Sequence, residues 1–155
     1  MRRIFDLFQT VRLTLAIAAM LLVPSCAPAF AAAGFEGDWK VPGDKAGEVA
    51  ATVTIERSGE RFRAVVKEIL AEPGAPDPVC HKKCPPDKRG RPIAGLEVMW
   101  GLKPEGDKLV DGYLLDPTEG LLVRCQLRLS PDGRTLLVKM YQGVPLLGST
   151  EEWKR

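Results

Sequence analysis

The sequence is poor in the groups that most enzymes use for catalysis. His81 is the only histidine among 155 residues, so a Ser-His-Asp or Cys-His arrangement would have to use it, directly beside Cys80. Residues 43–47 (GDKAG) have neither the spacing of a phosphate-binding loop nor a following helix. We therefore assign no catalytic residue, and we expect a protein that is not an enzyme and binds no cofactor.

Paired carboxylates, a second source of acid and base groups, are present but badly placed. Glu151 and Glu152 lie near a strand end, and Asp116 and Glu119 lie in a turn. Such positions are typical of solvated surface. We expect these four side chains at the surface rather than in a site.

The first 33 residues predict a secretory signal peptide. Arg2, Arg3 and Arg12 precede an apolar run at 13–23, and small residues follow it. The run is too short for a membrane-spanning helix, which needs about 20 residues. We therefore expect cleavage, export to the periplasm or beyond, and a single domain at 34–155. The VPSC sequence ending at Cys26 resembles a lipobox, so lipid anchoring through this cysteine is the alternative.

An excess of charge of one sign is also missing. The whole chain has 22 basic and 20 acidic residues, and removal of the predicted leader leaves 19 of each. A neutral mature protein has neither the basic footprint of a nucleic-acid-binding protein nor a general attraction to anionic lipid. We expect no nucleic-acid partner and no transmembrane span in the mature form.

Helical periodicity is absent, whereas alternation of apolar and polar residues is frequent. The clearest example is 121–129, where Val123, Cys125 and Leu127 alternate with polar residues, and a Pro-Asp-Gly turn leads into a second alternating run. Eight strands are predicted in all: 35–41, 51–57, 61–69, 93–102, 109–115, 121–129, 136–141 and 146–153.

Short strands joined by tight turns indicate an all-β sandwich or an up-and-down barrel. Successive hairpins favour the barrel, because an antiparallel meander of eight strands can close on itself and leave no exposed edge. The predicted fold is an eight-stranded antiparallel barrel with one long loop, rich in proline and cysteine, at 71–91.

Several motifs carry a family resemblance. GDW at 37–39 resembles the Gly-x-Trp signature of lipocalins, and WKR at 153–155 supplies the late cation that packs on the tryptophan in that family. More closely, RPIAGLEVMWGLKPEGD, DGYLLDPTEG and GVPLLGSTEEW resemble a bacterial family of small exported proteins classed as a domain of unknown function. This resemblance implies a lipocalin-like barrel with an internal cavity. It also implies a set of residues that close the barrel: Gly37, Trp39, Trp153 and Arg155.

The loop at 71–91 contains Cys80, His81 and Cys84, and Cys125 lies on a predicted inward row. Export favours a disulfide between Cys80 and Cys84, with Cys125 as the alternative partner of either. A zinc site would need an awkward ligand set, so we expect no bound metal. Thiol redox chemistry at Cys80 is also conceivable, since nearby lysines would lower a thiol pKa.

Three functions compete on this basis. The first is non-catalytic binding of a small apolar or amphipathic molecule inside the barrel. The second is docking on an envelope protein through the loop at 71–91, and a distant third is a redox or metal site at Cys80, His81 and Cys84. For the first function, the aromatic residues proposed to contact a ligand are Trp39, Trp100, Tyr113 and Tyr141.

Overall fold

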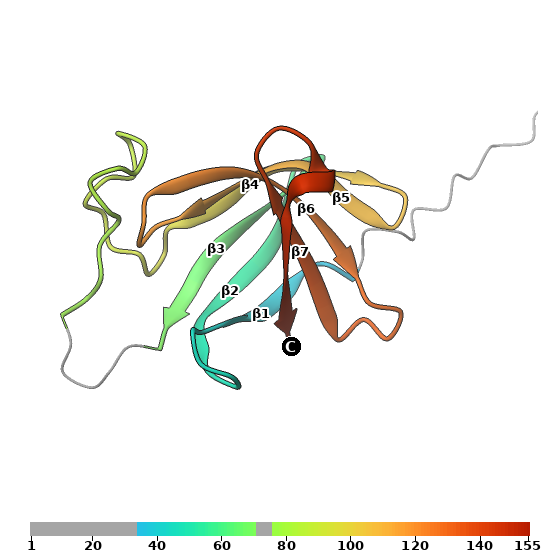
Figure 1. Ribbon diagram of the computed structural model, residues 1–155, viewed down its shortest axis with the longest axis horizontal. Helices are drawn as coiled ribbons and strands as arrows, with labels where there is room; N and C mark the ends of the chain where they lie inside the picture. Colours follow the sequence, from blue (N-terminus) through green and yellow to red (C-terminus); the bar gives the residue numbers. More distant parts are fainter. Residues whose placement is uncertain (1–33, 71–75) are drawn as a thin grey trace, which may run out of the picture.

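The computed structural model describes residues 34–70 and 76–155, which form eight antiparallel strands closed into one barrel (Figure 1). Each strand pairs with the next in the chain, and the last pairs with the first through Lys154 and Lys40. The strands are β1 (Gly37–Pro42), β2 (Val49–Ser58), β3 (Arg61–Ile69), β4 (Glu97–Glu105), β5 (Lys108–Asp116), β6 (Leu121–Leu129), β7 (Thr135–Tyr141) and β8 (Ser149–Lys154). The predicted fold class is therefore confirmed.

Two strands begin at least three residues later than the sequence predicts. The strand expected from residue 93 begins at Glu97, because Ile93 and Leu96 are hydrogen-bonded in a turn at the end of the preceding loop. The strand expected from residue 146 begins at Ser149, because Pro145–Leu147 form a short 3-10 turn. Proline favours this turn, since its fixed φ suits a helical start.

The alternation in β6 separates the core from the solvent as expected. Cys125 and Leu127 are fully buried inside the barrel, while Arg124 and Arg128 point outward into ion pairs with Asp111 and Asp107. Successive side chains of a strand point to opposite faces of the sheet, so one row of each strand fills the barrel. The thiol of Cys125 belongs to this core and is not in a disulfide.

One end of the barrel is closed by Trp39. Its ring is completely buried, its indole N–H donates to the carbonyl of Phe35 at 2.9 Å, and the Arg155 guanidinium covers it at 4.3 Å from the ring centroid. Gly37 precedes it with φ of +118°, a conformation that residues with a Cβ rarely adopt. This glycine lets the chain turn into β1 so that Trp39 faces inward.

Three predictions fall partly or wholly outside the described residues. These are the signal peptide at 1–33, the lipid anchor at Cys26, and the first part of the long loop, at 71–75. Within the described part of the chain, no helix has the length and apolar character needed to span a membrane.

Candidate functional site

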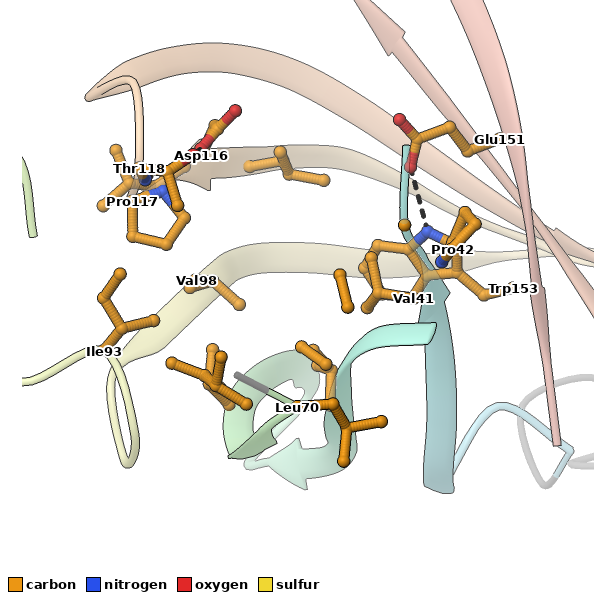
Figure 2. A pocket seen from close by; sticks show the side chains of 18 of the residues that line it. Val41, Pro42, Leu70, Ile93, Val98, Asp116, Pro117, Thr118, Glu151 and Trp153 are labelled. Atoms are coloured by element: carbon orange, nitrogen blue, oxygen red, sulfur yellow. Dashed lines mark hydrogen bonds between the residues drawn. The ribbon is translucent and has the colours of Figure 1, made fainter. Parts of the chain in front are cut away.

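A cavity of about 560 Å³ opens at the end of the barrel opposite Trp39. Figure 2 shows this cavity from close by. Its rim comes from the turn between β1 and β2, from the ends of the long β3–β4 loop and from the β5–β6 turn. The residues that line it are Val41, Pro42, Gly43, Asp44, Glu48, Ala50, Ala51, Val53, Val66, Ile69, Leu70, Pro78, Ile93, Val98, Leu114, Leu115, Asp116, Pro117, Thr118, Met140, Glu151 and Trp153.

The wall of the cavity is mainly aliphatic, and its deep part is formed by buried side chains. Val53 and Val66 are only 3% and 4% exposed, whereas Leu70 at the rim is 51% exposed. Val53 and Val66 lie on the inward rows of β2 and β3, where strand alternation places them. A molecule that enters the cavity would exchange water for apolar contact, at about 25 cal/mol per Å² of apolar surface buried.

Among the described residues, the charged side chains that line the cavity are all acidic. Glu48 accepts a hydrogen bond from the backbone of Lys45 at 3.0 Å, and Asp116 accepts one from the hydroxyl of Thr118 at 2.7 Å, so both organise their own turns. Glu151 differs, because it lies within β8 and accepts a hydrogen bond from the indole N–H of Trp153 at 3.1 Å (Figure 2). Glu151 is therefore a wall residue, not the solvated surface residue that the sequence suggests.

The cysteine-containing loop forms part of the rim. Cys80 and Cys84 are joined by a disulfide with a Cα–Cα distance of 6.2 Å, as the sequence predicts for the nearest pair. The backbone N–H of His81 donates to the carbonyl of Pro117 at 2.9 Å, which fastens the loop to the β5–β6 turn. Pro78 and Pro117 both line the cavity, so the disulfide-bonded loop holds one side of the opening in place.

The comparisons with known proteins place this barrel in a family. Residues 37–155 match the family described as "Uncharacterized protein conserved in bacteria (DUF2147)". The chain belongs to this family. The match covers every strand of the barrel from β1 to β8, and it confirms the resemblance to a bacterial domain of unknown function.

A solved structure is similar to this DUF2147 barrel. It is described as "Protein HP1028 from the human pathogen Helicobacter pylori belongs to the lipocalin family", with a TM-score of 0.65 and 18% sequence identity. The alignment covers 78% of the present chain and 82% of that chain. This likeness confirms the lipocalin-like fold. A comparison with curated proteins found no match.

The aromatic residues proposed for ligand contact do not line the cavity of the DUF2147 barrel. Trp39 is the plug of the closed end. Trp100, Tyr113 and Tyr141 lie on the outer face, where Tyr113 pairs with Trp100 on one side and Arg124 on the other, and Arg124 pairs with Tyr141. Only their residue type suggests ligand contact for these three residues, and the register of four strands puts them on the outer face.

These outer side chains form a ladder across the sheet. The rings of Trp100 and Tyr113 stack with centroids 5.9 Å apart, and Arg124 lies over Tyr113 at 4.6 Å. Lys88 of the long loop lies over Trp100 at 5.0 Å and pairs with Glu97 at 3.5 Å. The ladder thus attaches the base of the loop to the barrel wall, a structural role that its cation-π contacts can fill.

The predicted closure residues separate into two groups. Gly37, Trp39 and Arg155 lie together at the closed end, as the family resemblance implies. Trp153 instead lines the cavity, 4% exposed, with its N–H on Glu151. Glu151 is two positions from Trp153 in β8, so both side chains lie on the same face of the strand. This spacing is the sequence signal that could have placed the Glu151 carboxylate inside the barrel.

Other candidate sites of the sequence are not assembled in the described residues. No group of three or more His, Cys, Asp or Glu side chains is placed to hold a metal ion within 34–70 and 76–155. The imidazole Nδ1 of His81 accepts a hydrogen bond from the backbone of Lys83 at 3.2 Å. Cys125 is fully buried, and burial raises the pKa of its thiol to about 12. A reactive thiol needs a lowered pKa, so Cys125 does not have the properties of one.

A second hollow of similar volume lies near the β6–β7 turn. Among its lining residues Phe35 is buried and Leu129 is a half-buried residue of the inward row of β6, and the others are turn or outer-face residues. Its walls are therefore mainly the outer surface of the molecule rather than the barrel interior. The cavity at the open end is the better candidate for a ligand site, since ligand sites are concave, mostly apolar and have a few convergent polar groups.

Proposed function

We propose that the protein is an exported carrier that holds one small apolar or amphipathic molecule in the barrel without catalysis. The observation that supports this most directly is the cavity of about 560 Å³, open at one end and sealed at the other by Trp39. Eight-stranded barrels are wide enough for one small ligand. Here the aliphatic walls supply burial, and Glu151 with Thr118 supplies polar contact.

The export part of the proposal rests on the leader and the disulfide. The basic residues and apolar run of 1–33 have the layout of a signal peptide. A disulfide between Cys80 and Cys84 suits an oxidising compartment such as the periplasm. Cell fractionation tests this part: the mature protein should be found in the periplasmic fraction, and its mass should correspond to a chain that begins at or near residue 34.

A neutral fluorescent probe tests the carrier proposal. N-phenyl-1-naphthylamine brightens in apolar surroundings, so we expect saturable fluorescence on addition of the protein. Ala51 pairs with Val41 and Ile69, which line the cavity, and the adjacent Thr52 pairs with outward Lys40. Ala51→Phe should obstruct the cavity and weaken the signal, while Thr52→Phe, the matched control on the outer face, should keep it.

Two results would count against the carrier. One is the absence of saturable probe binding by the folded parent protein. The other is equal binding by the Ala51→Phe and Thr52→Phe variants, which would place the probe on the surface. Circular dichroism of both variants verifies that each retains the β-sheet of the parent.

Docking on an envelope protein through 71–91 is the second candidate. It is supported by Val79, which is 53% exposed in a loop that the disulfide and the β5–β6 turn hold in one conformation. Val79→Asp should then abolish partner capture and leave probe binding unchanged. The redox or metal hypothesis ranks third, because Cys80 and Cys84 are bonded to each other.

A further inference from the structure

We propose that the molecule held in the cavity is an amphipathic cation, with an ammonium-type group on an apolar body. The inference rests on the proposed carrier function and adds the sign of the ligand's charge. In the described part of the chain, four carboxylates and no lysine, arginine or histidine line the cavity. The carboxylates are those of Asp44, Glu48, Asp116 and Glu151.

Glu151 is the residue best placed to meet such a charge. It occupies the inward row of β8, two residues from Trp153, whereas Asp44 and Glu48 lie in the β1–β2 turn and Asp116 is the last residue of β5, at the rim. The Trp153 indole N–H binds Oε2 and fixes the carboxylate. Among the described residues, Oε1 has no hydrogen-bond partner, so this oxygen can accept from a ligand N–H.

The surroundings of Glu151 strengthen an interaction with a cation. Trp153 is 4% exposed, and Val41 and Met140 in the same wall are apolar. Two opposite charges attract more strongly where protein replaces water, because the effective dielectric constant falls. A charge at this position would therefore contribute more to binding than a pair on the open surface.

Two basic side chains from elements that contribute to the cavity form ion pairs elsewhere. Lys154 pairs with Glu152 at 2.8 Å on the outer row of β8, and Lys88 pairs with Glu97 outside the barrel. Within the described residues no basic side chain forms an ion pair with Glu151, so its charge is available to a ligand. An anionic headgroup at the opening would instead meet four like charges, which disfavours carboxylate or phosphate amphiphiles.

Three probes with the same alkyl chain test the charge: octylammonium, 1-octanol and octanoate, each used to displace N-phenyl-1-naphthylamine at low ionic strength. We expect octylammonium to bind at least about fivefold more tightly than octanoate, the ratio that corresponds to about 1 kcal/mol. Glu151→Gln keeps the acceptor for Trp153 and removes the charge. It should weaken octylammonium about fivefold and leave 1-octanol unchanged.

Glu152→Gln is the matched control, because Glu152 is the next residue and faces outward. It should change none of the three affinities. Octanoate binding as tightly as octylammonium to the parent protein would overturn the inference, and so would an unchanged preference in Glu151→Gln. The parent comparison decides the question even if that variant does not fold.

The same experiment separates the two proposals. If 1-octanol displaces the probe and the charged compounds show no preference for the cation, the charge inference fails and the carrier function stands. If the probe does not bind and no compound has an effect, the carrier function fails, and the charge inference fails with it.

Discussion

Arg155 and Trp39 are separated by 116 positions in the sequence, and the guanidinium of the first lies over the indole of the second at 4.3 Å from its centroid. The same guanidinium donates hydrogen bonds to the carbonyls of Gly34 and Glu36, the latter at 3.2 Å. The contact joins the start of β1 to the end of β8. It therefore seals the barrel at the one place where strands distant in sequence must meet.

Replacement of Arg155 by methionine should lower the free energy of unfolding by about 1–2 kcal/mol, since it removes a cation-π contact and charge-assisted hydrogen bonds but keeps an apolar stem. Urea denaturation measures this loss. Lys40→Met is the control, because Lys40 is exposed on the neighbouring strand, and it should stay within about 0.5 kcal/mol. Equal effects of the two substitutions would show that Arg155 adds nothing beyond an ordinary surface cation.

Gly120 is expected to be less replaceable than Gly106, although both have positive φ, +69° and +58°. A Cβ at Gly120 would lie 2.8 Å from the backbone nitrogen of Cys84, whereas a Cβ at Gly106 would contact nothing within 4 Å. Gly106→Ala should cost about 1 kcal/mol from backbone strain alone. Gly120→Ala should cost at least about 2 kcal/mol, because the disulfide-bonded loop must move.

Thermal or urea unfolding of the two alanine variants measures this difference. Hydrogen exchange adds its location: Gly120→Ala should speed exchange at the backbone N–H groups of His81 and Cys84, and Gly106→Ala should not. Equal stability of the two variants would mean that the loop does not pack tightly against the β5–β6 turn.

The Cys125 thiol should make stability depend on alkaline pH. Burial raises its pKa from the ordinary 9.0 to about 12, partly opposed by the nearby charge of Arg124. Above pH 9 the unfolded chain loses this proton and the native protein keeps it. The free energy of unfolding should therefore fall with rising pH between 9 and 12, by at most about 1.4 kcal/mol per pH unit from this group.

Cys125→Ala isolates this contribution. The stability difference between parent and variant should be constant from pH 7 to 8.5 and should then shrink as the pH rises, because the variant has no thiol to ionise. Urea unfolding at half-unit intervals up to pH 10.5 gives both curves. Parallel curves over this range would contradict a buried neutral thiol.

Removal of the disulfide by Cys80→Ser together with Cys84→Ser should loosen the rim and leave the barrel intact. The disulfide closes a short loop, so its entropic contribution is about 2 kcal/mol in the chain-entropy description. Hydrogen exchange should become faster in residues 76–92, including the backbone N–H of His81 that donates to Pro117. The backbone N–H groups of β6 and β7 should stay protected. General loss of protection across the barrel would contradict a local role.

The barrel could be predicted because its information is local. Alternation in Val123, Cys125 and Leu127 identifies an inward row, and turn residues between alternating runs fix the order of hairpins. Closure of the barrel follows because it pairs the backbone N–H and C=O groups that an edge strand would leave exposed. The disulfide was predictable for the same reason, since its two cysteines are four positions apart.

The residues that line the cavity could not be predicted, because they depend on the register between strands. Tyr113 lies outside since it pairs with Trp100 and Arg124 across three strands, and no local pattern states that pairing. Glu151 is the opposite case: its carboxylate suggests solvent, but strand parity with Trp153 places it in the wall. In both cases the residue type suggests the wrong location, and the strand geometry determines on which face the side chain lies.

The most direct test of the carrier function is the position of a bound alkyl chain, read by nuclear Overhauser effects from 1-octanol to the methyl groups of the protein. We predict contacts to Val53, Val66 and Leu114, which line the cavity. Contacts confined to Leu146 and Leu147, which are 87% and 82% exposed, would place the chain on the surface and contradict a ligand site inside the barrel.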